Sequence, residues 1–287
     1  MNAIMQRANC DFVYVFGDVH GAFEDLLRVL HTLPDGHKIS DFPGRIVFLG
    51  DYLDRATTLG DSFSTLFYLL WLEATYPDKI TLLLGNHEDF SYFTDPGSVM
   101  NTASPQEHNA FFGHFVTFDA VKTLLDPFFA TAPLGAVAYD EAFIVHAGIL
   151  GRLKPIEELR SVSRPGFNTG TSAGTTGYTD QERAKSMGTK VFQTVPGHGG
   201  PPPKCSSDAA LLWADPARPG HTQSRCGQDQ MVPGGRPWTA EVAKEFFSLN
   251  GIRLLLRGHE PGEFSDMVKS LLICVTSSFV STFFSPV

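Results

Sequence analysis

Five short stretches of the chain combine carboxylates, an amide, histidines and arginines with glycine. In chain order they are GDVHG at 17–21, GDYLDR at 50–55, GNHE at 85–88, HAG at 146–148 and RGH at 257–259. Glycine lets the backbone turn sharply and approach a ligand closely. Taken alone, Asp18 and His20 of the first stretch would also suit an ordinary capped turn between a strand and a helix. The five stretches together point instead to a shared site.

The side chains in these stretches form a mixed set of oxygen and nitrogen donors. The candidate metal ligands are Asp18, His20, Asp51, Asn86, His146 and His259. Two aspartates, one asparagine and three histidines suit Mn, Fe or Zn better than Ca or Mg. If one aspartate bridges two ions, the set suffices for a pair about 3.5–4 Å apart, an arrangement that serves phosphate-ester hydrolysis.

The elements that must position these residues are short apolar runs, each of which leads into one of the stretches. The runs lie at 12–18, 45–51, 80–86, 142–148 and 252–259. Their continuous apolar character predicts strands buried on both faces. Helical patterns lie between them at 23–33, 61–76 and 239–251, so we expect an α/β layered fold. Ligands bind beyond the carboxyl ends of strands in such sheets, where the five stretches should converge.

The ordered set GDVHG, GDYLDR, GNHE, HAG and RGH resembles the motifs of calcineurin-like metallophosphoesterases, and in particular those of the PPP-type serine/threonine protein phosphatases. The stretches LLWADP at 211–216 and 240–259 are also similar to that group, so the resemblance spans about 12–160 and 208–261. It implies a central β-sandwich flanked by helices, with a dinuclear metal site at the carboxyl ends of the strands.

The resemblance also implies a role for each metal ligand. Asp18 and His20 would bind the first metal and Asp51 would bridge both, while the second metal would be completed by Asn86, His146 and His259. A hydroxide bridging the two metals would attack phosphorus in line, with no covalent enzyme intermediate.

Further roles carried over by the resemblance concern the leaving group and the phosphate. His87 would be the general acid that protonates the leaving oxygen, and Asp54 would orient its imidazole. Arg55 would grip the phosphate, for which a bidentate guanidinium is well shaped. Arg225 is our candidate for a second phosphate-binding arginine, with Arg236 as its rival.

The chain departs from the family pattern at several positions. Ala56, Leu84 and Ala147 stand where the group usually has glycine, arginine and glycine, and no ligand is lost. In 262–287 the serine- and asparagine-rich segment with a tyrosine that usually follows the last metal histidine is not recognisable, so we expect an altered closing sheet.

Composition narrows the class of partner. A hydrophobic fraction of 43% indicates a globular protein, and a formal net charge of -9 argues against a nucleic-acid ligand. Four cysteines without a CxxC pair fit a reducing compartment, and the start of the sequence lacks the apolar run of a secretory signal, so we expect a cytoplasmic protein.

Two segments interrupt the α/β pattern. Residues 161–207 are rich in Gly, Ser, Thr and Pro and predict a flexible surface insertion in a single domain of residues 1–287. The uncharged segment 270–287 is long enough for a membrane anchor, but its strand-forming residues and its Ser, Thr and Pro content favour sheet strands.

These observations predict an enzyme that hydrolyses phosphomonoesters with two metal ions (Mn, Fe or Zn), acting on phosphoserine or phosphothreonine in proteins. One alternative is a diadenosine tetraphosphatase or another nucleotide or small-molecule phosphoesterase. A second is a catalytically impaired binding scaffold, against which the complete ligand set speaks. Glu88 in GNHE, where Asp would otherwise stand, favours the protein phosphatases. No regulatory partner can be named from the sequence.

Overall fold

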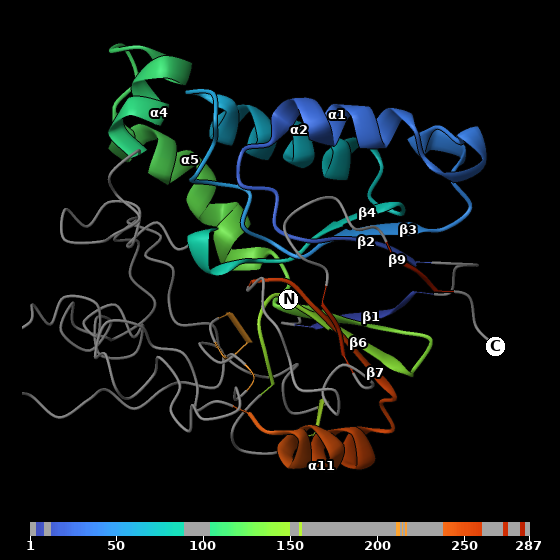
Figure 1. Ribbon diagram of the computed structural model, residues 1–287. Coiled ribbons are helices and arrows are strands. Elements are labelled where there is room, and N and C mark those ends of the chain that lie inside the picture. The colour runs from blue at the N-terminus through green and yellow to red at the C-terminus, as the bar shows by residue number, and fades with distance from the viewer. Residues whose placement is uncertain are drawn as a thin grey trace, which may run out of the picture.

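The computed structural model describes residues 4–8, 13–88, 104–149, 155–156, 211–212, 214, 216, 238–259, 272–274 and 282–284. Two β-sheets stack on each other in the middle of the molecule, and helices cover their outer faces (Figure 1). This arrangement confirms the predicted α/β fold with a central β-sandwich.

One sheet has the strand order β4-β3-β2-β9. Its strands are β2 (Val13–Phe16), β3 (Arg45–Phe48), β4 (Ile80–Leu82) and β9 (Thr282–Phe284). β2, β3 and β4 run parallel, so their carboxyl ends lie at the same edge, while β9 pairs antiparallel with β2. Three of the five predicted strands are found here.

The other sheet has the order β1-β5-β6-β7-β8. Its strands are β1 (Ile4–Ala8), β5 (Gly135–Ala138), β6 (Ala142–Val145), β7 (Leu254–Arg257) and β8 (Leu272–Cys274). β6 and β7 are the two remaining predicted strands, and they run parallel in register from Ala142 opposite Leu254 to Val145 opposite Arg257. Their carboxyl ends therefore also lie side by side.

Alternation along the strands divides the core into two layers. Val13 and Val15 of β2 belong to the apolar cluster between the sheets, whereas Tyr14 and Phe16 belong to the larger cluster that includes the helices. In β6, Ile144 faces the inner cluster in the same way. The period of two explains why every position of these strands is apolar, because both faces are buried.

Helices form the outer layers. α1 (Phe23–His31) and α2 (Asp61–Thr75) lie above the β4-β3-β2-β9 sheet, and α11 (Ala240–Asn250) lies below the other sheet (Figure 1). All three were predicted; Thr239 caps α11 by accepting the Val242 N–H, and Gly251 ends it in a left-handed conformation. The sequence analysis missed α4 (Ser104–Phe112) and α5 (Phe118–Thr131), and in α5 the internal Pro127 obscures the helical pattern.

The uncharged C-terminal segment contributes β8 and β9, so the strand interpretation holds for those six residues. β9 completes the pairing of β2, which lies at the other end of the sequence. Among the described residues, no helix is long and apolar enough to cross a membrane. The insertion predicted at 161–207 lies outside the described residues, and the single-domain boundaries stay a prediction.

Candidate metal centre

The five polar stretches meet at the carboxyl ends of strands from both sheets. Asp18, Asp51 and Asn86 follow β2, β3 and β4, while His146 and His259 follow β6 and β7. Backbone hydrogen bonds tie the strand ends together: the His20 N–H donates to the Asp51 carbonyl at 2.7 Å, and the Gly258 N–H donates to the His146 carbonyl at 2.8 Å. Segments far apart in sequence therefore place their side chains in one small volume.

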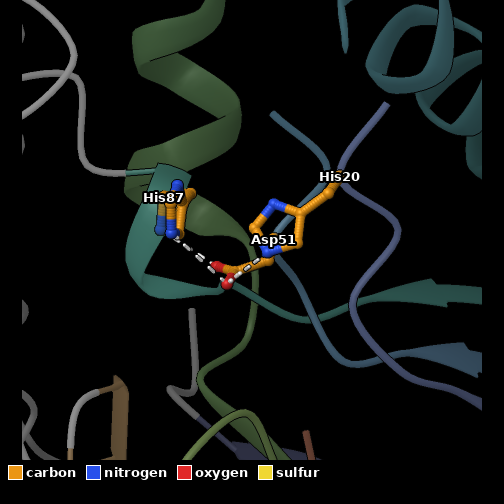
Figure 2. Close-up of side chains that lie close together, drawn as sticks. All are labelled: His20, Asp51 and His87. Carbon is orange, nitrogen blue, oxygen red and sulfur yellow. Dashed lines mark hydrogen bonds and ion pairs between the residues drawn. The ribbon is translucent and has the colours of Figure 1, made fainter. Parts of the chain in front are cut away.

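One group of possible metal ligands comprises His20, Asp51 and His87 (Figure 2). Oδ2 of Asp51 lies 3.5 Å from Nε2 of His20 and 3.7 Å from Nε2 of His87. The Asp51 carboxylate stands between the two imidazoles, as Figure 2 shows. Its backbone is in the left-handed region, with φ 53°, which aims the side chain into the site.

A second group comprises Asp51, His146 and His259, with the Asn86 amide beside them. Oδ1 of Asp51 is 3.4 Å from Nε2 of His146. Nε2 of His146 and Nδ1 of His259 are 3.2 Å apart, and Oδ1 of Asn86 lies 2.8 Å and 2.9 Å from them. The two groups share Asp51, one carboxylate oxygen facing each, which is the geometry that a bridging ligand requires.

The tautomers of two histidines follow from their outer contacts. Nδ1 of His20 lies 3.1 Å from the Leu53 carbonyl, and Nδ1 of His146 lies 3.1 Å from the Leu49 carbonyl. A carbonyl oxygen only accepts, so each Nδ1 carries the proton and each Nε2 presents a lone pair to the site. Such outer hydrogen bonds are a common feature of metal-binding histidines.

The orientation of the Asn86 amide is a further sign of what the site can bind. With Oδ1 turned inward, the amide oxygen faces Nε2 of His146 and Nδ1 of His259. An acceptor oxygen then lies close to ring nitrogens that can also act as acceptors. With the amide turned over, its NH2 group would donate to both rings and to Asp51 instead. A bound cation selects the first orientation, because an amide oxygen is a ligand and an NH2 group is not.

The pKa values of the ligands shift in opposite directions for the same reason. Burial, with the charges of His87 and Arg55, lowers the pKa of His20 to about 3. Burial raises the pKa of Asp18 to about 6, against the His259 N–H and the charge of Arg257, which lower it. Histidines that resist protonation beside carboxyls that resist ionisation make a site where a divalent cation supplies the missing charge, so this donor set fits two metal ions.

The structure adds detail for Asp18. Both of its carboxylate oxygens accept the His259 N–H at 3.0 Å, and Oδ1 lies 3.8 Å from Nδ1 of His146. Asp18 thus borders the site, but it belongs to neither of the two compact groups found among the described residues. A Cβ at Gly258 would stand 2.2 Å from Oδ1 of Asp18, so only glycine allows this approach. Its role as a ligand of the first metal stays a prediction.

His87 lies between two carboxylates. Its Nδ1 is 3.3 Å from Oδ2 of Asp54, and its Nε2 faces Asp51. Burial lowers the pKa of His87, while Asp54 raises it. Burial raises the pKa of Asp54, but His87, the Arg55 N–H and His20 together outweigh it, so the pKa is lowered. Nδ1 is therefore oriented by Asp54 and Nε2 points into the site, as a proton donor requires.

Arg55 lies at the open side of the site. Arg55 is exposed, and its Nη1 donates to Nε2 of His20 at 3.2 Å. The guanidinium therefore lies beside the ligand group of His20, Asp51 and His87. A phosphate bound at that group would be close enough to accept hydrogen bonds from Arg55. The proposed second arginine, Arg225, and its rival Arg236 lie outside the described residues, so their role stays a prediction.

Sequence reasoning missed the structural part that Glu88 has in this site. Its fully buried carboxylate accepts four backbone N–H groups, from Asp51 at 2.7 Å, Tyr52 at 2.8 Å, Gly85 at 2.9 Å and Leu53 at 3.2 Å. Burial raises the pKa of Glu88 to about 7, against these N–H groups. A Cβ at Gly85 would lie 2.2 Å from Oδ1 of Asp51, so glycine is required beside the bridge. GNHE is thus a structural unit as well as a source of ligands.

Comparison with known proteins adds a family to this geometry. The family model described as Calcineurin-like phosphoesterase matches residues 13–263. The chain belongs to this family. The matched range begins at β2 and contains all five strand-end stretches, so the convergence described above is that of a calcineurin-like phosphoesterase.

Protein phosphatases are among the relatives of this family member. Serine/threonine-protein phosphatase PP1-1 of Saccharomyces cerevisiae is 29% identical over 252 residues, which cover 86% of this chain and 62% of that protein. The chain thus spans less than two thirds of the length of this curated relative.

Solved structures share the fold at low sequence identity. A serine/threonine phosphatase from S. cerevisiae with similarity to human PP5 superposes with a TM-score of 0.65 at 17% identity, covering 96% of this chain and 71% of that one. A cold-active protein tyrosine phosphatase gives 0.57 at 17% identity, covering 96% and 72%. A cold-active protein-tyrosine phosphatase of a Shewanella species gives 0.55 at 16%, covering 97% and 74%.

Proposed function

We propose that the chain is a metal-dependent phosphoprotein phosphatase that hydrolyses phosphoserine and phosphothreonine. The observation that carries the proposal is the Asp51 carboxylate, whose Oδ2 lies near His20 and the proposed acid His87 and whose Oδ1 lies near His146, with Arg55 in contact with His20. The similarity to a yeast serine/threonine-protein phosphatase supports the substrate class.

The residues divide the work of hydrolysis. Asp51, His146, His259, Asn86 and the first-metal ligands Asp18 and His20 would hold two ions, which supply positive charge to the phosphoryl oxygens and make water a better nucleophile near neutral pH. Arg55 donates N–H groups to the phosphate and fixes its orientation.

His87 protonates the leaving oxygen in the proposed reaction. Serine and threonine alkoxides are strong bases, so hydrolysis of their phosphate esters gains much from a proton delivered as the P–O bond breaks. Nε2 faces the site and Nδ1 faces Asp54, so the Asp54 carboxylate stabilises the protonated ring and holds its orientation.

Arg225 is proposed as a second phosphate ligand.

The decisive experiment compares substrates and one pair of variants. With manganese added, the chain should hydrolyse a phosphoserine peptide faster than a phosphotyrosine peptide or a dinucleotide polyphosphate. His87→Ala should keep two metal equivalents by elemental analysis and lose turnover by about 10²–10⁴-fold. The exposed His114 provides the matched control, and His114→Ala should leave turnover unchanged.

Three results would each contradict the proposal in a different way. A metal-loaded protein that cleaves no phosphate ester would favour a binding scaffold. Preference for the dinucleotide polyphosphate would favour the nucleotide-hydrolase alternative. Loss of metal in His87→Ala would make His87 a ligand in place of an acid.

The proposal also covers the substrate and the cellular location of the protein. The substrate is a phosphorylated protein or peptide, and the acidic composition speaks against nucleic acid. The scattered cysteines support a cytoplasmic location.

A further inference from the structure

The segment 51–60 carries three residues of the proposed reaction on an unusual backbone. Asp51, Asp54 and Arg55 all have left-handed φ values, of 53°, 67° and 60°. Each such conformation costs a non-glycine residue free energy and persists only where surrounding contacts hold it. Asp54 orients His87 and Arg55 reaches the phosphate, so whatever holds this backbone also places both side chains.

Two buried carboxylates from outside the segment hold its two ends. Glu88 accepts the N–H groups of Asp51, Tyr52 and Leu53 at the beginning. At the far end, Glu107 of α4 accepts the Gly60 N–H at 2.7 Å, where α2 begins. Glu107 is only 1% exposed, although α4 is an outer helix.

Glu107 lies where α4 packs against the Gly60 end of segment 51–60. The backbone of α4 at Ala110 and Phe111 lies within 3.6 Å of the place where a Gly60 Cβ would stand, so α4 packs directly on the end of the segment. Burial raises the pKa of Glu107, against the N–H groups of Gly60 and Ser62, and the charges of Asp61 and Asp54 raise it further.

Arg55 depends on this backbone more than the metal ligands do. It is exposed, and its Nη1 contact with His20 is to a single ring nitrogen. Asp51, in contrast, is buried and held by Glu88 through its own N–H. Loosening the Gly60 end should therefore move Arg55 and leave Asp51 in place.

We propose that Glu107 is a positioning residue: by holding the Gly60 end of segment 51–60 on α4, it sets the position of Arg55 for binding a tetrahedral oxyanion. The inference rests on the proposed function for the role of Arg55. Glu107 itself touches neither substrate nor metal ligand in the contacts described above, and it acts through the backbone of the segment.

The test measures oxyanion binding without turnover, on the full chain loaded with manganese. Tungstate serves as the tetrahedral oxyanion, and its Kd is obtained by calorimetric titration. Glu107→Ala should weaken tungstate binding about tenfold, which is the loss expected when one charge-assisted hydrogen bond from Arg55 to the oxyanion is no longer well placed. Metal content should remain that of the wild type.

Rescue and coupling separate positioning from general damage. Glu107→Gln keeps an oxygen that can accept the Gly60 N–H and should bind tungstate within about twofold of the wild type. In the Arg55→Ala background, Glu107→Ala should cause no further weakening, because the residue it places is gone. The exposed Gln106 of α4 gives the matched control, and Gln106→Ala should bind tungstate like the wild type.

The proposal is overturned if Glu107→Ala binds tungstate like the wild type, if its effect persists in the Arg55→Ala background, or if metal is lost in parallel. If Glu107→Ala does not fold, Glu107→Asp takes its place, because the shorter side chain draws the acceptor away from Gly60, and the same outcomes apply. A folded, metal-loaded wild type that neither binds tungstate nor cleaves a phosphate ester would instead overturn the proposed function.

Discussion

Replacing Asp18 by asparagine should stabilise the metal-free protein, although it removes the charge of a predicted ligand. The side chain of Asp18 is only 4% exposed, and burial raises its pKa from the ordinary 3.8 to about 6. At about 1.4 kcal/mol per pKa unit, ionised Asp18 costs the folded state about 3 kcal/mol. Asparagine, like the neutral carboxyl, keeps an oxygen for the His259 N–H, and the pKa of about 6 already includes the effect of that bond on the charged form. A gain of about 3 kcal/mol in unfolding free energy is therefore expected at pH 8.

The gain in unfolding free energy from Asp18→Asn should increase as the pH rises. The folded pKa of Asp18 is raised, so between about pH 4 and pH 6 the folded carboxyl binds more protons than the unfolded one. Its contribution to stability is therefore present below pH 4 and lost as the pH rises through 6. At pH 5 the difference between Asp18→Asn and the wild type should be well below that at pH 8.

Manganese should reduce the difference in stability between Asp18→Asn and the wild type. Binding to the folded state alone adds about 2.7 kcal/mol at a concentration 100-fold above Kd, and the variant should gain less because a neutral amide oxygen binds a cation more weakly than a carboxylate does. Urea denaturation with chelator or with manganese, at pH 5 and pH 8, measures all four values. Asp78→Asn, at an exposed position, is the matched control. A variant less stable than the wild type in chelator at pH 8, or a difference that is equal at both pH values, would refute the reasoning.

Two further predictions concern the ligands and their support. Glu88→Gln should lower the unfolding free energy by about 2–4 kcal/mol in urea denaturation. The NH2 group of the glutamine would face two backbone N–H groups that now donate to one carboxylate oxygen. An unchanged midpoint would show instead that the backbone adapts. His146→Ala should bind one metal equivalent in place of two by elemental analysis, because it removes a ligand from the group with His259 and leaves His20 intact; two retained equivalents would contradict the assignment.

Much of the metal centre was predictable because its residues follow buried strands. A parallel strand covered on both faces must be an apolar run, and the next residues must turn at the carboxyl edge. The positions of Asp18, Asn86 and His146 at the ends of strands could therefore be predicted from local sequence alone. The same reasoning missed β5, whose four residues Gly135–Ala138 give too short and too small a pattern.

Other features of the site depend on contacts between distant segments. In sequence Glu88 stands out only as part of GNHE and Glu107 looks like an ordinary acidic residue, but each accepts a backbone N–H of a segment more than 30 residues away. β9 pairs with β2 across nearly the whole chain.

The sequence by itself determined the types of ligand and the strands that carry them, because both are written in neighbouring residues. Only the tertiary structure decided that Asp51 faces two groups of ligands, which ring nitrogens of His20 and His146 are protonated, and what holds Arg55. The physical reason is that carboxylate sharing, tautomers and backbone strain are set by atoms brought together in space, and residues far apart in sequence supply those atoms.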